Sequence, residues 1–253
     1  MFIQENRTKR KLRAGQPVYG VLSTSDDPQL AELFGLAGFD FYMLDAEHGL
    51  MDAVQVVNVI RACERVNTTP LIRIGSKDPK LVLQYMDAGM MGVMMPGLES
   101  AAEIRMLFDA VKYSPVGKRG MGFARAAAYG ALGQEAIDYI NFTNEETMVI
   151  PQFEDAALID RFEEMLSQPE VDVVVIGPRD LSLNMGFPDG PNHPEVQEMI
   201  DRVIALCKRK GVAAGITAGT RADAAHQVAR GARMIIAPAQ AVILSGSKEF
   251  LPA

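Results

Sequence analysis

Two acidic residues that follow apolar, strand-like segments carry the strongest chemical signal in the sequence. Glu154 ends the run MVIPQFE, and Asp180 comes three residues after the run VDVVVIG. Two carboxylates without a histidine or cysteine cluster form an oxygen-donor site that suits Mg²⁺ or Mn²⁺, with open positions for water. Taken alone, each acid is better explained as a helix cap or a partner in a surface ion pair. Together, at neighbouring strand ends, they predict a metal site.

A histidine and an arginine stand at comparable positions. His48 follows Asp45 by three residues, a spacing that lets the carboxylate hold one imidazole nitrogen while the other transfers a proton. A lone histidine is more often structural, and that alternative stays open. Arg73 lies near the end of TPLIRI, and its forked guanidinium can stabilise a carboxylate or a developing enolate oxygen. The alternative for Arg73 is an internal salt bridge to Glu47 or Asp45.

The segment 177–180, Gly-Pro-Arg-Asp, adds a possible anion site, because the backbone N–H groups of Arg179 and Asp180 can hold a substrate carboxylate. A Schiff-base aldolase would instead need a buried lysine. None of the apolar runs contains one, and the nearest candidate, Lys77, lies three residues beyond its run in a predicted loop. A metal, a base and an arginine predict chemistry beside the carbonyl of a 2-oxo acid, with the metal acting as a Lewis acid.

Short apolar runs rich in β-branched residues must position these groups. Their nearly continuous hydrophobicity is typical of strands buried on both faces in a parallel sheet. Helical patterns separate them, including one after Asp52 that buries Cys63, one at 193–210 and one at 221–230. The predicted strands are 18–23, 39–45, 69–74, 92–96, 148–154, 171–177, 212–218 and 232–238.

Eight strands that alternate with helices in 253 residues predict an α/β fold of the (β/α)8 TIM barrel type, in which reactive groups gather at the carboxyl ends of the strands. A doubly wound open sheet is the alternative. It lacks support, because no G-x-G-x-x-G turn follows the first strand, and GITAGT at 215–220 is interpreted as a tight turn. The long connection 113–147 is expected to be functional or to make subunit contacts.

Composition narrows the functional classes. Hydrophobic residues make up 48% of the chain, which is enough for a large core, and no linker divides it, so residues 1–253 are interpreted as one domain. The net charge of -7 argues against a nucleic-acid binder. No apolar run is long enough for a membrane span, and only two cysteines are present, so a cytoplasmic protein is expected. The basic cluster at 7–13 is interpreted as the solvated face of a short helix.

Several long motifs, found in order along nearly the whole chain, resemble the HpcH/HpaI aldolase family, the metal-dependent class II pyruvate aldolases. An ordered set of this kind is far more specific than any single triplet, and it supports the eight-stranded barrel independently. The motifs are LDAEHG (44–49), PLIRI (70–74), YSPVGKRGMGFARAAAYG (113–130), QFE (152–154), IGPRDLSLNMG (176–186) and HPEV (193–196).

The resemblance implies a role for each of the main candidates. Glu154 and Asp180 correspond to the carboxylates that hold Mg²⁺, Mn²⁺ or Co²⁺, with waters completing the shell. His48 corresponds to the base, paired with Asp45 and acting through a metal-bound water. Arg73 corresponds to the residue that polarises the pyruvate carbonyl and steadies its enolate.

It also implies supporting residues. Gln152 matches a position that lines the pyruvate site, and Glu47 matches a partner of the residues that touch the substrate. The family forms trimers or hexamers with sites near subunit interfaces, so a homo-oligomer is expected, to which Asp87 and Arg125 contribute. One departure is Arg179, which stands where the family commonly has alanine and adds a cation near the expected binding site for small-molecule substrates.

The expected reaction is the reversible cleavage of a 4-hydroxy-2-oxo acid to pyruvate and an aldehyde. One alternative keeps the metal site but acts on citryl- or malyl-type thioesters of coenzyme A, for which no obvious basic patch is visible in the sequence. The other alternative is a non-catalytic barrel that binds a 2-oxo acid or acts as an assembly partner. The combination of two acids, a histidine and an arginine at strand ends argues against this last possibility.

Overall fold

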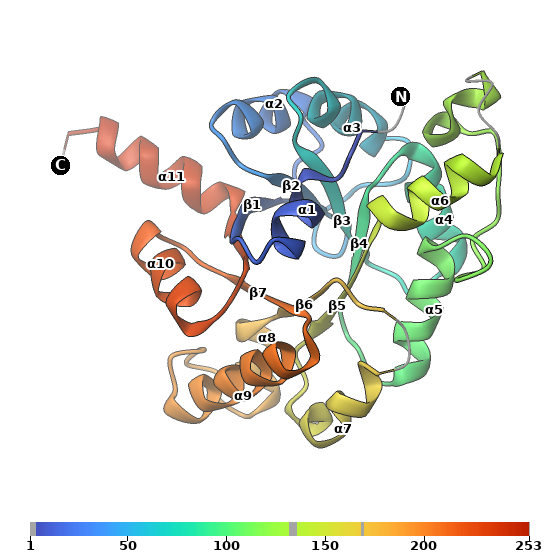
Figure 1. Cartoon of the computed structure of the whole chain (residues 1–253). Coiled ribbons are helices and arrows are strands. Elements are labelled where there is room, and N and C mark those ends of the chain that lie inside the picture. Colours follow the sequence, from blue (N-terminus) through green and yellow to red (C-terminus); the bar gives the residue numbers. More distant parts are fainter. Residues whose placement is uncertain (1–3, 132–135, 168–169, 253) are drawn as a thin grey trace.

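Eight parallel strands close into a barrel in chain order in the computed structural model, which describes residues 4–131, 136–167 and 170–252. Figure 1 shows the strands at the centre and helices around them. The (β/α)8 prediction is confirmed, and the open-sheet alternative is wrong because β1 pairs with β8. The strands are β1 (Val18–Ser23), β2 (Phe41–Asp45), β3 (Thr69–Arg73), β4 (Gly92–Met95), β5 (Met148–Phe153), β6 (Val173–Ile176), β7 (Ala213–Thr217) and β8 (Met234–Pro238).

Alternation along each strand sorts its side chains into two cores. In β2, Phe41 and Met43 belong to the cluster that fills the barrel, whereas Tyr42 and Leu44 pack against the surrounding helices. The same parity places Met148 and Ile150 of β5 inside the barrel. Polar residues that continue the inward-facing series at the carboxyl ends of strands are therefore directed to the barrel mouth.

The helices form the outer layer. The predicted helix at 221–230 is confirmed, and so is the one in the segment 193–210, whose first helical residue is Pro194, as the position of the proline predicts. The helices are α1 (Arg7–Arg13), α2 (Pro28–Leu36), α3 (Val56–Arg65), α4 (Pro79–Ala88), α5 (Ala101–Val111), α6 (Ala136–Glu146), α7 (Ile159–Met165), α8 (Pro178–Asn184), α9 (Pro194–Lys210), α10 (Arg221–Arg230) and α11 (Ala239–Phe250), with 3-10 turns η1 (Arg125–Gly130) and η2 (Ala156–Leu158).

The helix predicted after Asp52 starts later than expected, at Val56. The Asp52 carboxylate accepts hydrogen bonds from the backbone N–H groups of Val54 and Gln55, so it fixes the turn that leads into α3. Cys63 is fully buried on this helix, as expected for a small core residue.

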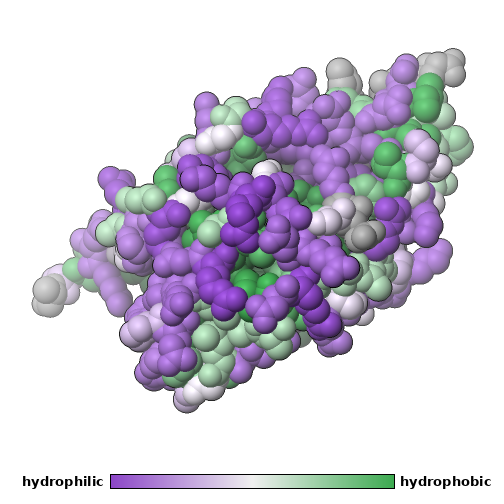
Figure 2. Space-filling view, turned by 60° about the horizontal axis from the view of Figure 1, so that its bottom comes forward, coloured by the Kyte–Doolittle hydropathy of each residue, from purple (hydrophilic) through white to green (hydrophobic). Residues whose placement is uncertain are grey.

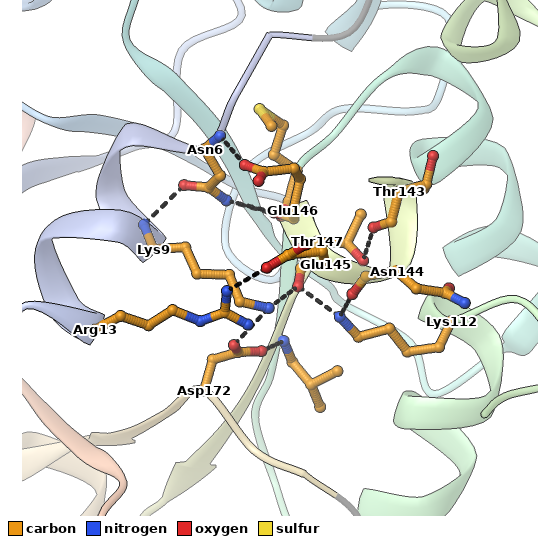
Figure 3. Close-up of polar contacts among 12 residues, drawn as sticks. Asn6, Lys9, Arg13, Lys112, Thr143, Asn144, Glu145, Glu146, Thr147 and Asp172 are labelled. Carbon is orange, nitrogen blue, oxygen red and sulfur yellow. Dashed lines mark hydrogen bonds and ion pairs between the residues drawn. The ribbon is translucent and has the colours of Figure 1, made fainter. Parts of the chain in front are cut away.

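Helix α1 lies across the amino-terminal ends of the strands, and this position corrects the interpretation of its basic residues. Lys9 is buried, donates to the backbone oxygen of Thr147 at 2.8 Å and pairs with Asp172 at 2.8 Å (Figure 3). These two partners stand immediately before β5 and β6. Lys9 therefore ties α1 to the bottom of the barrel, whereas Arg10 and Arg13 are exposed as predicted.

The long connection 113–147 contains η1 and α6, and its residues 132–135 lie outside the described residues. At the end of α6, the Glu146 backbone oxygen accepts a hydrogen bond from the Asn6 side chain at 2.8 Å (Figure 3). The connection thus fastens the segment before α1 to the amino-terminal end of the barrel.

Helix α11 extends away from the barrel in Figure 1. Several of its large apolar side chains are exposed. Ile243 is 45% exposed and Leu244 58% exposed. Figure 2 shows a face dominated by hydrophilic residues with hydrophobic ones between them. Among the described residues, no helix is both long and apolar enough to cross a membrane.

Candidate active site

Asp45 and Arg73 form the buried centre of the barrel mouth. They are register partners at the ends of β2 and β3, and both continue the inward-facing series of their strands. The Arg73 Nε donates to Asp45 Oδ1 at 2.9 Å, and Nη2 donates to Oδ2 at 2.6 Å. The guanidinium is therefore held by a two-point contact in a fixed orientation. The salt bridge between them, one of the alternatives for Arg73, is present.

The electrostatic state of this pair follows from burial and proximity. Burial alone would raise the pKa of Asp45, but the hydrogen bonds and charge of Arg73, with the backbone N–H groups of His48 and Glu47, hold it below its ordinary value. Burial would likewise lower the pKa of Arg73, and the Asp45 carboxylate outweighs it and raises that pKa. Both groups are charged at neutral pH.

The expected contact between the His48 ring and Asp45 is replaced by another arrangement. Asp45 Oδ1 accepts hydrogen bonds from the backbone N–H groups of Glu47 and His48, each at 3.2 Å. The imidazole is 65% exposed, and its Nε2 lies 3.9 Å from Glu47 Oε2. The physical reason is that strand pairing places Arg73 against the carboxylate, while the turn after β2 carries the histidine toward solvent.

Glu47 links the arginine to the histidine. Its Oε2 lies 3.1 Å from Arg73 Nη1, so the second proposed salt bridge of Arg73 is also present. Burial raises the pKa of Glu47; the charge of Arg73 opposes this shift, whereas nearby Glu154 adds to it. The carboxyl groups of Glu47 and Glu154 are therefore close enough to influence each other's ionisation.

Glu154 comes immediately after β5, and contacts on both oxygens hold its carboxylate. Oε1 accepts a hydrogen bond from the backbone N–H of Gly97, and Oε2 accepts one from the Gln152 side-chain amide. Burial raises the pKa of Glu154; the Gly97 N–H opposes the shift, and the charge of Asp180 adds to it. Asp180 is exposed in the first turn of α8. The two predicted acids thus interact electrostatically at one end of the barrel.

Gly177 allows this packing. A Cβ at this position would lie 2.7 Å from Gln152 Nε2 and 3.1 Å from Glu154 Oε2, closer than side chains tolerate. Gln152 is buried, and its Oε1 has no hydrogen-bond partner within the described part of the chain. A buried amide oxygen without a partner is costly, and it suits a site completed by a ligand.

These residues fit a divalent cation that draws further oxygen ligands from water or substrate. The described ranges hold no group of three or more histidine, cysteine, aspartate or glutamate residues suited to a metal. Two carboxylates can still bind a hard cation when small molecules fill the remaining positions, as for Mg²⁺ at substrate sites. The uncommitted lone pairs of Glu154, the nearby Asp180 and the unsatisfied Gln152 oxygen agree with that donor set.

Asp87 and Arg125 do not lie at the barrel mouth. Asp87, at the end of α4, accepts a hydrogen bond from Arg119 at 2.7 Å. Arg125 donates to Glu64 and to the Ala88 backbone oxygen, both at 3.0 Å. Helix ends of this kind face the amino-terminal end of the barrel, opposite Asp45 and Glu154. The expected contribution of Asp87 and Arg125 at a subunit interface stays a prediction.

Arg179, the departure from the family pattern, is exposed on α8. Its Nη1 would lie 3.2 Å from a Cβ built on Gly190, so its side chain extends over the loop between α8 and α9. Its backbone N–H lies in the first turn of α8, where N–H groups have no partner within the helix.

Sequence reasoning missed Gly97 and the contacts of Lys77 with Gly97 and Glu103. Gly97 follows β4 in a left-handed conformation, with φ at +62°, and its N–H faces Glu154. Lys77, correctly placed in a loop, donates to the Gly97 backbone oxygen and to Glu103 Oε1. The Pro96-Gly97 pair directly after a strand was the available signal, since it marks a turn at the mouth.

Comparisons with known proteins identify relatives of this chain. A family model described as HpcH/HpaI aldolase/citrate lyase matches residues 19–241. A 4-hydroxy-2-oxo-heptane-1,7-dioate aldolase of Escherichia coli is 31% identical over 98% of this chain and 94% of its own. A hydroxypyruvate/pyruvate aldolase of Pseudomonas aeruginosa is 35% identical over 85% of this chain and 80% of its own.

A solved structure extends the agreement to three dimensions. The crystal structure of an HpcH/HpaI aldolase/citrate lyase family protein from Burkholderia cenocepacia J2315 matches with a TM-score of 0.89 and 31% identity, and the match covers 97% of both chains. The resemblance of the motifs, the barrel and the family model all point the same way. The chain belongs to the HpcH/HpaI aldolase/citrate lyase family.

Proposed function

We propose that this protein is a divalent-metal-dependent aldolase that reversibly cleaves a 4-hydroxy-2-oxo acid to pyruvate and an aldehyde. The observation that carries the proposal is that Glu154 and Asp180 follow the paired strands β5 and β6 at the barrel mouth, where the charge of the ion-paired Arg73 also acts on Glu154. Family membership supports carbon–carbon bond chemistry, and the two relatives named above are called aldolases.

In this proposal, Glu154 and Asp180 hold Mg²⁺, Mn²⁺ or Co²⁺. When bound, the cation supplies Lewis acidity to the 2-oxo acid. Arg73, fixed by Asp45, presents its remaining N–H groups to the oxygen where enolate charge develops. Gln152 lines the same position. The backbone N–H groups of Arg179 and Asp180, with Gly177 leaving room beside them, bind the substrate carboxylate.

His48 takes the proton from the C4 hydroxyl of the substrate. Its exposed ring sits at the mouth with Glu47 3.9 Å away, close enough for that carboxylate to stabilise the imidazolium that forms. The C3–C4 bond then breaks, its electron pair enters the pyruvate enolate, and the C4 oxygen becomes the aldehyde carbonyl. Return of a proton to C3 gives pyruvate and restores the histidine.

Exchange of the pyruvate methyl protons in D₂O tests the proposal directly. We expect the purified protein with Mn²⁺ to catalyse the exchange, and Glu154→Gln to abolish it while the fold persists by circular dichroism. A chelator should stop the exchange by the wild-type protein as well. Wild-type protein that shows no metal-dependent exchange would contradict the mechanism. Cleavage of malyl-type coenzyme A thioesters, without exchange, would favour the lyase alternative.

We further propose that the protein works as a homo-oligomer, a trimer or a hexamer. The exposed apolar side chains of α11 support this, because large apolar groups gathered on a projecting helix are typical of interfaces. Light scattering coupled to size-exclusion chromatography measures the mass of the assembly, and a monomer at micromolar concentration would contradict the proposal.

A further inference from the structure

We infer that Lys77 is a positioning residue that sets the orientation of the Glu154 carboxylate through the Gly97 peptide group. The inference rests on the proposed function, because it concerns the acid assigned there to the metal. Lys77 lies in the loop between β3 and α4, and its Nζ donates to both the Gly97 backbone oxygen and Glu103 Oε1, the latter at 2.6 Å. It thus joins the loop after β3 to the loop after β4 and to the first turn of α5.

Glu103 is a firm anchor for the lysine. It is the third residue of α5 and forms a capping box with Ser100, in which its Oε2 accepts the backbone N–H of Ser100 at 3.3 Å. The same oxygen accepts the N–H of Glu99 at 2.6 Å. Oε1 is thereby left for Lys77, and the carboxylate is fixed to the helix start. The lysine side chain is held against a rigid element rather than moving freely over the surface.

Gly97 transmits this constraint to Glu154. Its carbonyl oxygen faces Lys77, whereas its N–H donates to Glu154 Oε1. Its φ of +62° is accessible to glycine at little cost, and the nearest atoms to a Cβ built there belong to Lys77 and Glu154, at 3.8 to 4.0 Å. The hydrogen bond from Lys77 is therefore a main restraint on the direction of the Gly97 N–H.

The consequence falls on the carboxylate. Gly97 holds Oε1 and the Gln152 amide holds Oε2, so the remaining lone pairs of Glu154 point in a fixed direction. The partly exposed Lys77–Glu103 ion pair by itself contributes little to stability. Partners that orient a metal ligand matter more, and their removal typically lowers metal affinity by about 10- to 100-fold.

Titration of the metal-free, full-length protein with Mn²⁺, followed by isothermal calorimetry in the absence of substrate, tests this role. We expect Lys77→Met to raise the Kd for Mn²⁺ by about tenfold. Lys77→Arg keeps two donors and should restore most of the affinity. Lys80→Met removes an exposed lysine three residues away and should leave the Kd unchanged.

Glu103→Gln supplies a second route to the same answer. The amide has one acceptor oxygen for the three donors that the carboxylate satisfies, so we expect a weaker hold on Lys77 and a raised Kd. Because both residues act on Gly97, the double variant Lys77→Met with Glu103→Gln should bind Mn²⁺ no more weakly than Lys77→Met alone. Additive losses would show independent effects and overturn the inference.

The outcomes separate this inference from the proposed function. If Lys77→Met binds Mn²⁺ like the wild-type protein while Glu154→Gln loses binding, Lys77 has no positioning role and the metal site stands. If the wild-type protein binds no Mn²⁺ and catalyses no methyl-proton exchange, both ideas fail. With the inference correct, raising the Mn²⁺ concentration should recover most of the kcat of Lys77→Met, a response that a merely structural defect would not give.

Discussion

At the scale of single residues, Arg73 is the best-defined group in the site. Strand register places it opposite Asp45, and its fork has room for both oxygens of that carboxylate. Glu47 takes a third contact. A buried guanidinium needs such partners, because desolvation of an unpaired charge is expensive. The arginine is therefore both a structural link between β2 and β3 and the group expected to meet the enolate.

Replacing Asp45 by asparagine tests both of these roles. The amide keeps one acceptor and loses the negative charge, so we expect a loss of about 3 kcal/mol in the free energy of unfolding at pH 7. The kcat should fall as well, since the guanidinium is no longer fixed. Urea denaturation and steady-state kinetics measure both effects.

The pH dependence of stability provides the control for that variant. The pKa of Asp45 is lowered in the folded protein by Arg73, so its contribution is present above the unfolded pKa and is lost as pH falls through the folded value. The stability gap between wild-type protein and Asp45→Asn should therefore narrow under acid conditions. A gap that stays constant down to about pH 3 would show that ionisation of Asp45 is irrelevant.

Sequence reasoning identifies the residues that strands deliver and misses those that loops deliver. Asp45, Arg73 and Glu154 end or follow apolar runs, and strand alternation alone directs them inward. The side-chain direction of His48 and the contact between Lys77 and Gly97 depend on the path of turns, which periodicity does not specify. The contact expected between the histidine ring and Asp45 failed for this reason.

At the scale of elements, the apolar runs predict all eight strands because burial on both faces leaves a continuous signal. The predicted and observed strand boundaries differ by one or two residues where the apolar run extends beyond the residues that pair with a neighbouring strand. Residues 39–40, before β2, are an example. The helix patterns place α9 and α10 well because glycines follow both in left-handed conformations. The hydrophobic pattern of residues 239–250 does not predict that α11 projects away from the barrel.

The close approach of β5 to the turn after β6 leads to a prediction at this scale. Gly177→Ala would place a methyl group against Gln152 and Glu154, and these side chains must shift to accommodate it. We expect a loss of about 1–3 kcal/mol in stability and a weaker affinity for Mn²⁺. Thermal unfolding and Mn²⁺ titration measure the two effects.

Gly246→Ala is the matched control. Gly246 lies within α11, a Cβ there has nothing within 4 Å, and alanine favours a helix by about 0.5–1 kcal/mol. This variant should be as stable as the wild-type protein or slightly more so, with unchanged Mn²⁺ binding. Equal Mn²⁺ affinity in both glycine variants would mean that the contact at Gly177 does not shape the site.

At the scale of the whole molecule, the two ends of the barrel have separate tasks. The mouth holds the acids and Arg73, whereas the opposite end contains two buried lysines, Lys9 of α1 and Lys112 (Figure 3). Lys112 Nζ donates to the Thr147 backbone oxygen at 2.7 Å, and Lys9 Nζ donates to the same oxygen. Asp172 pairs with Lys9 alone. Two buried lysines thus share one carbonyl oxygen, and only Lys9 has a carboxylate partner among the described residues.

Lys112 gives this end a distinct pH dependence. Burial, reinforced by the charge of Lys9, lowers the pKa of Lys112 to about 7. Between that value and its unfolded pKa of about 10.4, the unfolded chain binds a proton that the folded protein lacks, so this lysine makes stability rise with pH. Lys112→Met should remove a slope of roughly 1 kcal/mol per pH unit between pH 8 and 10, measured by urea denaturation.

Lys118→Met is the control, because Lys118 is 78% exposed and pairs with Asp109 at the surface. The free energy of unfolding of Lys118→Met should follow the wild-type pH dependence between about pH 8 and 10. Parallel profiles for wild-type protein and Lys112→Met would refute the altered proton affinity of the buried lysine. Because both lysines lie far from the mouth, neither variant should change Mn²⁺ binding.

Because α11 projects from the barrel, we expect the Tm of the protein to depend on protein concentration. Ile243 and Leu244 are only partly covered by their own chain, so a second copy that covered them, as proposed above, would bind only the folded form and shift the folding equilibrium toward it. Serial dilution should then lower the Tm steadily. A Tm that stays constant over a roughly thousandfold range of dilution would mean that self-association does not stabilise the folded chain.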